Sequence, residues 1–138
     1  MSTNDINVTM QLLRRTVLAS SEVQAIVHGR VYLDHFYDYE EANSVMPMVV
    51  LDPRGGRGAY DKSNQRLSVD VYCYDKNSAD VVTELYDLVY QALECTRFGH
   101  ASTTQAGYAY EIFRPLAGYN NYIKAYFRRG TFAVLTAG

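Results

Sequence analysis

The sequence has no tryptophan, only two cysteines and three prolines, and no long apolar run. Cys73 and Cys95 are too few and too far apart for a disulfide framework or a zinc site. We interpret Cys73 as a small buried hydrophobe. The longest stretch without a charged residue, Phe98 to Tyr110, is mostly polar and small. It does not approach the ~20 apolar residues that span a membrane, so we expect no membrane partner.

The sequence also lacks an excess of charge of one sign. It has 13 Lys and Arg against 15 Asp and Glu, a net charge of -2, which argues against a dedicated nucleic-acid binder. The N-terminus has neither the basic start nor the apolar middle of a signal peptide, so we expect a protein made and kept in a cytoplasm. With 138 residues, 48% of them hydrophobic, residues 1–138 predict a single domain with a real core.

The N-terminal part of the chain predicts two helices and a short strand. Asn4 or Asp5 can cap an amphipathic helix of about four turns. Glu22–His28 can form one or two further helical turns, and Gly29 is a natural stop. Val31–Asp34 then predicts a short strand, and we interpret the acidic and aromatic stretch that follows, as far as Asn43, as a loop.

The middle of the chain predicts a hairpin. Pro47 opens a strand over Met48–Asp52, and the glycine-rich segment Asp52–Gly58 predicts a turn or loop tip. Arg66–Tyr74 alternates apolar and polar residues with a period of two, which is typical of a half-buried antiparallel strand. We expect these two strands to pair.

The C-terminal part predicts a second main helix from Ala79 to about Cys95, capped by Asn77 or Ser78. Two more strands follow. One covers Tyr108–Arg114 and ends at Pro115, after which Leu116–Asn121 predicts a loop. The last strand runs from Tyr122 to about Leu135, with a bulge expected at Gly130.

This order of elements predicts an α+β domain: a mostly antiparallel sheet with two main helices packed on one face. The other face of the sheet is then unusually polar and aromatic. We assign eight residues to it: Ser68, Asp70, Tyr72, Tyr74, Tyr122, Lys124, Tyr126 and Arg128.

No motif carries recognisable chemistry. Gly55–Gly58 is glycine-rich, but no Gly-Lys-Ser/Thr follows it, so a phosphate-binding loop is disfavoured. The histidines are scattered, and no cysteine or serine has a nucleophile context. Asp34, His35, Asp38, Glu40 and Glu41 can be drawn as a metal cluster, but dense acidic loops are more often simply solvated. We predict no cofactor and no metal; an enzyme whose catalytic groups converge from distant parts of the chain stays an alternative.

The tyrosines invite two interpretations. The sequence has 13 of them, and four lie on the predicted polar face: Tyr72, Tyr74, Tyr122 and Tyr126. With Lys124 and Arg128 beside them, they can form a stacking platform for single-stranded nucleic acid. We favour the second interpretation, a protein–protein interface, because tyrosine buries area while keeping a polar tip and because the chain is net acidic.

Two neighbouring stretches carry opposite charge. Asp34–Glu41 has four acidic and no basic residues, whereas Arg54–Arg66 has four basic residues and one acidic. An acidic loop and a basic loop on one small domain suit head-to-tail contact between copies, which makes a ring if it closes. The alternative is that both loops are simply exposed. We predict that Arg54, Arg57 and Arg66 of one copy meet three acidic residues of a neighbour: Asp38, Glu40 and Glu41.

Four segments carry a resemblance to a family. They are Val-His-Gly-Arg-Val-Tyr-Leu-Asp (27–34), Met-Pro-Met-Val-Val-Leu-Asp (46–52), the alternating strand from Gln65 to Asp75, and a helix from Ser78-Ala-Asp-Val-Val to Gln91-Ala-Leu-Glu94. In this order they resemble the tail-completion, or tail-terminator, proteins of tailed bacteriophages, over about Ile6 to Leu135. These motifs are core patterns rather than catalytic signatures.

The resemblance implies a non-enzymatic structural role in the virion. Such proteins assemble as a ring, commonly of six copies, on the head-proximal end of the tail tube, stop its growth and join the tail to the head connector. The implied partners are further copies of the chain, the tail tube protein, the head–tail connector or stopper protein, and DNA passing through the lumen without sequence-specific binding. The alternative within virion proteins is another neck ring, such as a head-completion or stopper protein.

Overall fold

A computed structural model of the chain describes residues 3–33, 35, 39–53, 60–61, 66–94, 96–99 and 106–137. The elements follow in this order: α1 (Thr3–Leu18), α2 (Ser21–Val27), β1 (Val31–Tyr32), α3 (Tyr39–Ser44), β2 (Met48–Pro53), β3 (Tyr60–Asp61), β4 (Arg66–Asp75), α4 (Ala79–Leu93), β5 (Thr96–Gly99), β6 (Ala106–Asn120) and β7 (Ala125–Ala137).

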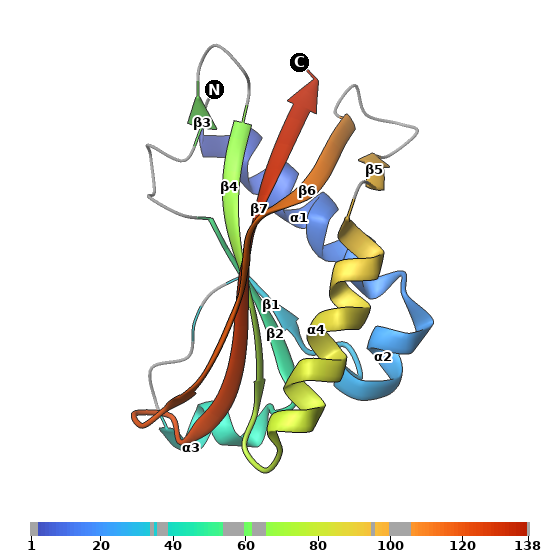
Figure 1. Cartoon of the computed structure of the whole chain (residues 1–138). Helices are drawn as coiled ribbons and strands as arrows, with labels where there is room; N and C mark the ends of the chain where they lie inside the picture. The colour runs from blue at the N-terminus through green and yellow to red at the C-terminus, as the bar shows by residue number, and fades with distance from the viewer. Residues whose placement is uncertain are drawn as a thin grey trace.

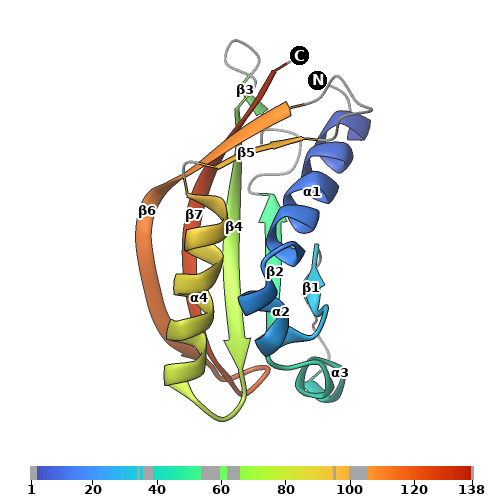
Figure 2. The same ribbon diagram turned by 90° about the vertical axis from the view of Figure 1, so that its right-hand side faces the viewer.

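In the described part of the chain, the strands form one sheet in the order β1-β2-β4-β7-β6-β5, with β3 paired to β4 beside this path. Only the β1–β2 pair is parallel. Helices α1, α2 and α4 cover one face of the sheet, and α3 lies at one end of it (Figure 1). The same layering is visible after a quarter turn (Figure 2). The predicted α+β class, a mostly antiparallel sheet with its main helices on one face, is confirmed.

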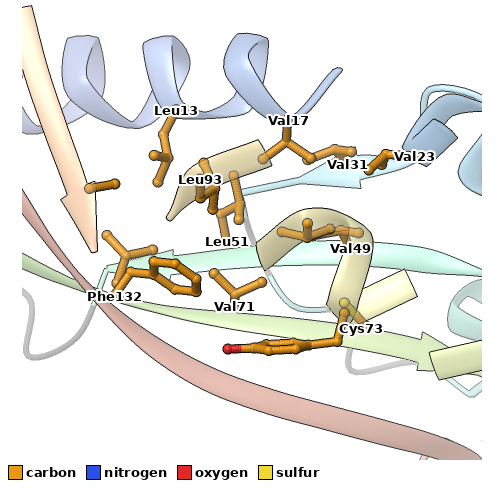
Figure 3. Packing of buried hydrophobic residues seen from close by; sticks show 14 of the residues in the cluster. Leu13, Val17, Val23, Val31, Val49, Leu51, Val71, Cys73, Leu93 and Phe132 are labelled. Atoms are coloured by element: carbon orange, nitrogen blue, oxygen red, sulfur yellow. The ribbon is translucent and has the colours of Figure 1, made fainter. Parts of the chain in front are cut away.

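The main core lies between these helices and the sheet, on what we call the helix face (Figure 3). It is built from Leu13 and Val17 of α1, Leu93 of α4, and strand residues such as Val71 and Phe132, all fully buried. The apolar positions of β4 are Leu67, Val69, Val71 and Cys73, as the alternation predicts. Burying such side chains stabilises the fold by roughly 1.5–3 kcal/mol each.

Local sequence signals set the helix ends. The hydroxyl of Ser20 accepts the Val23 N–H at 3.3 Å and caps α2. His28 ends that helix at φ 49° and Gly29 follows at φ 84°, so the predicted stop at Gly29 is confirmed. Ser78, one of the two predicted caps, accepts the Val81 N–H at 3.3 Å and starts α4.

The strand register around β4 confirms one prediction and refines another. β2 and β4 pair antiparallel, as expected for the hairpin. β4 and β7 pair without interruption from Arg66↔Leu135 to Asp75↔Tyr126, so no bulge forms at Gly130 against β4. On the other side of β7 the register with β6 does shift there, since Thr131 pairs with Phe113 and Arg129 with Leu116, so the predicted irregularity at Gly130 lies in the β6–β7 pair. A glycine is required at position 130 for another reason: a Cβ there would overlap the ring of Tyr86 and its hydroxyl. The glycine makes room for the large buried side chain of α4.

β6 is the largest correction. The prediction ended a strand at Pro115 and placed a loop over Leu116–Asn121, but β6 continues to Asn120. Register shifts between Glu111 and Phe113 and between Phe113 and Leu116 mark where the bulges lie. β5 pairs only with the start of β6, so proline falls where the strand is at the sheet edge and its missing N–H costs nothing.

Three smaller elements also differ from the sequence prediction. α3 forms over Tyr39–Ser44, inside the stretch interpreted as a loop, and its Ala42 is fully buried. The short strand β5 was not predicted. β7 begins at Ala125 rather than Tyr122, because residues 121–124 make the turn of the β6–β7 hairpin. The Asn120 carboxamide oxygen holds this turn by accepting the N–H groups of Tyr122 at 2.9 Å and Ile123 at 3.2 Å.

Candidate assembly surface

The sheet face opposite the main helices, here called the outer face, carries a second apolar cluster. Tyr74 is only 4% exposed and packs with Met48, Val50 and Ala42 of the neighbouring elements. Tyr72 is half-buried and stacks on Tyr74, with ring centroids 5.7 Å apart and planes 3° from parallel. These two tyrosines, predicted as contact residues, therefore pack mainly against other residues of the same chain. Burial raises the pKa of Tyr74 above its ordinary range, which keeps its hydroxyl neutral.

The polar side chains next to this cluster interact with other side chains of the same chain. His35 Nε2 lies 3.2 Å from Asp52 Oδ2, and its ring meets Tyr72 edge-on at 4.7 Å between centroids. Arg129 lies over the Tyr72 ring and hydrogen-bonds its hydroxyl, which raises the pKa of the guanidinium. Asp70 is buried and accepts the Thr131 hydroxyl at 2.6 Å. The outer face therefore combines an apolar cluster with polar side chains that are paired within the chain.

The register corrects the predicted membership of the outer face. Cα partners across antiparallel strands share a side, and Arg128 pairs with Cys73 while Tyr126 pairs with Asp75. Tyr126 and Arg128 therefore lie on the helix side of the sheet, opposite to Tyr72. The other two predicted members, Tyr122 and Lys124, lie in the hairpin turn and are exposed. The predicted alternation correctly placed Tyr126 and Arg128 on one side of β7, but without the cross-strand register it did not show that this side faces the helices.

This separation bears on the nucleic-acid alternative. A stacking platform needs its aromatic rings exposed on one surface. Here Tyr74 is buried, Tyr72 is packed against it, and Tyr122 and Tyr126 lie elsewhere. The four-tyrosine platform predicted from the sequence does not form within the chain.

Large exposed side chains lie instead along the half of the β6–β7 hairpin that includes its turn, residues 113–126, here called its outer half. They lie on both of its sides, because Leu116 pairs with Arg129 on the outer face and Tyr119 pairs with Tyr126 on the helix side. The exposed fractions are 58% for Phe113, 55% for Leu116, 46% for Tyr119 and 69% for Tyr122. Tyr119 and Tyr126 meet edge-on at 5.0 Å between ring centroids. Sequence reasoning missed Phe113, Leu116 and Tyr119 because Pro115 was taken as the end of the strand. The available signal was the apolar sequence continuing on both sides of that proline.

A buried polar network ties the hairpin to α4. The Tyr86 hydroxyl donates to Glu111 Oε2 at 2.6 Å, and Glu94 Oε2 accepts the Glu111 N–H at 2.6 Å. Burial and the bond to Glu111 raise the pKa of Tyr86 above its ordinary range. The Arg128 guanidinium lies 5.9 Å from the Tyr86 ring centroid, and its buried Nε finds no acceptor among the described residues.

Most of the predicted charge pairing falls outside the described residues. Arg54, Arg57 and Asp38 are not described, and only the backbone of Arg66 and Glu40 is. Glu41, on α3, is exposed. The structure therefore does not test the pairing of the arginine set with the acidic set.

The residues that the structure describes hold no group of three or more His, Cys, Asp or Glu side chains placed to bind a metal ion. No helix among them is long and apolar enough to cross a membrane.

Comparison of the sequence with protein-family models found no match, and comparison with curated proteins found none. Among solved structures, the fold is similar to that of a chain in a structure described as the virion of a native gene transfer agent particle. The TM-score is 0.67, the sequences are 13% identical, and the match covers 93% of each chain. At this identity the likeness is one of fold.

Proposed function

We propose that this chain is a structural protein of a phage-like virion, which assembles as a ring at the head-proximal end of the tail, ends the tail tube and joins it to the head connector. The observation that carries the proposal is the fold shared over 93% of both chains with a component of a gene transfer agent virion. The resemblance of the sequence to tail-terminator proteins supports the more specific role.

The distribution of exposed side chains supports an assembly role. Monomeric proteins rarely group large apolar side chains at one exposed place, and such patches mark interaction sites. The outer half of the β6–β7 hairpin exposes several along its length, including Phe113, Leu116 and Tyr122. A ring component is covered by copies and partners over much of its surface, which accounts for this exposure.

The proposal includes partners and location. The ring contacts further copies of the chain, the tail tube protein and the connector or stopper protein, and DNA passes through its lumen without sequence-specific binding. It acts without a cofactor and without catalysis. Arg54, Arg57 and Arg66 pairing with Asp38, Glu40 and Glu41 of a neighbour remains part of the proposal. The protein is located in the host cytoplasm before assembly and in the neck of the virion afterwards.

Binding to isolated particle parts tests this role. The purified protein is mixed with isolated tail tubes or with DNA-filled heads of the same particle, and each is recovered by sedimentation. The proposal predicts that the protein sediments with tubes and occupies one tube end in electron micrographs. Sedimentation with heads alone would contradict it and favour the head-completion or stopper role.

A further inference from the structure

Beyond Glu111, the β6–β7 hairpin carries basic residues and no acidic one. Between Ile112 and Ala137 the sequence has four basic residues and no acidic one: Arg114, Lys124, Arg128 and Arg129. Lys124 lies in the exposed hairpin turn, beside the most exposed aromatic side chain of the described residues, Tyr122. The end of the hairpin, Leu116–Tyr126, is therefore an aromatic projection whose single charge is that of Lys124.

The solvent-exposed side of α4, here called its outer side, carries the opposite charge. Asp80, Glu84 and Asp87 are exposed, and no Lys or Arg occurs between Ala79 and Leu93. Their spacing of four and three residues places the three carboxylates on one side of the helix, where they repel one another. Tyr90, three residues further on, extends this row and is 37% exposed. No ion pair with these three carboxylates forms among the described residues.

The two surfaces are placed for contact between copies rather than within one. The hairpin turn and the start of α4 lie toward the same end of the molecule in both views, and Figure 1 shows them on opposite sides of it (Figures 1 and 2). Two different patches on opposite sides of one subunit form a heterologous contact, which closes into a ring when the rotation allows.

We propose that the end of the β6–β7 hairpin, from Leu116 to Tyr126, docks on the outer side of α4 in the next copy of the chain. This rests on the proposed ring and names the contact that builds it. Tyr119, on the helix side of the hairpin, and Tyr122, in its turn, supply the aromatic part of the ~800 Å² that each side of a stable interface buries. Lys124 meets the carboxylate row and sets the orientation, since complementary charge fixes register and speeds encounter.

Directed crosslinking tests this contact. In a background of Cys73→Ala and Cys95→Ser, one variant carries Tyr122→Cys and Asp87→Cys together, and two others carry one change each. After mild oxidation, the double variant should form a ladder of covalent oligomers ending at the ring. An equal mixture of the single variants should stop at a linked dimer. A matched control joins Tyr122→Cys to Gln11→Cys, an exposed position on α1, and should give no ladder.

Charge reversal gives an independent readout. Asp80→Lys, Glu84→Lys and Asp87→Lys together should weaken assembly at least tenfold at low salt, with the unfolding midpoint retained. Lys124→Asp should weaken it too, and aspartate tolerates the positive φ of 52° at this position. Mixing the two reversed proteins should restore mixed oligomers.

The outcomes separate the two proposals. If the unaltered protein forms rings but the double-cysteine variant gives no ladder, or the lysine variant assembles at unaltered affinity, this docking contact is wrong and the ring stands. If the unaltered protein forms no ring, alone or on tail tubes, the proposed function fails and the contact fails with it.

Discussion

At the scale of single residues, Gly130 and Tyr86 form a matched pair. The Tyr86 ring crosses β7 at the one position without a side chain, and a Cβ there would lie 2.6 Å from the ring Cζ. We expect Gly130→Ala to lower the free energy of unfolding by about 1–3 kcal/mol through overpacking. Chemical denaturation measures this. In a Tyr86→Leu background the same change should cost clearly less; an equal cost in both backgrounds would show that the ring is not the cause.

The buried thiol of Cys73 makes stability depend on pH. Burial raises its pKa above the ordinary range, with the Arg128 charge opposing in part. The folded chain therefore keeps the proton while the unfolded chain loses it above about pH 8.5, so this contribution is present below that pH and lost as pH rises. Between pH 7.5 and 9.5 we expect the unfolding free energy to fall about 1 kcal/mol more in the unaltered protein than in Cys73→Ala. Parallel pH profiles would contradict this.

At the scale of elements, the cap of α4 carries a prediction. Ser78 accepts the Val81 N–H, and its own N–H donates to Asp75 Oδ2 at 2.9 Å. Ser78→Ala removes the side-chain acceptor and should cost about 1 kcal/mol of unfolding free energy. Ser21→Ala, at an exposed position inside the first turn of α2, is the control and should change little. A loss as large at Ser21 would mean that capping is not what is measured.

Elements with a strong local pattern were predictable from the sequence. The alternation of β4, the apolar stripes of α1 and α4, and the stop at Gly29 follow from period and capping chemistry. The continuation of β6 past Pro115 was not predictable, because proline usually ends a strand and only the edge position of β6 permits it. The need for glycine at position 130 was missed for a related reason: its cause is the distant Tyr86, which a local pattern does not reveal.

At the scale of the whole molecule, the candidate surface was only partly predictable. Excess tyrosine predicts a contact surface, and this stays a prediction; the structure shows that Tyr119 and Tyr122 are exposed on the hairpin. Which tyrosines share a side depends on register between β4 and β7, a long-range property set by the fold. For that reason the sequence did not reveal that Tyr74 is a core residue or that Tyr126 lies on the helix side of the sheet.

A ring gives these features one explanation. The domain has a well-filled core on its helix face and a second cluster around Tyr74 on its outer face, yet it exposes aromatic side chains at the hairpin end and a row of carboxylates on α4. Stability within one copy requires neither of the last two. The proposed contact between copies uses both.

The central claim, that copies of this chain close into a ring, is tested most directly by class averages of the purified protein in electron micrographs, taken alone and with isolated tail tubes. The account predicts closed rings with rotational symmetry, seen end-on in free protein or capping one end of each tube. A persistent monomer that never caps a tube would contradict it.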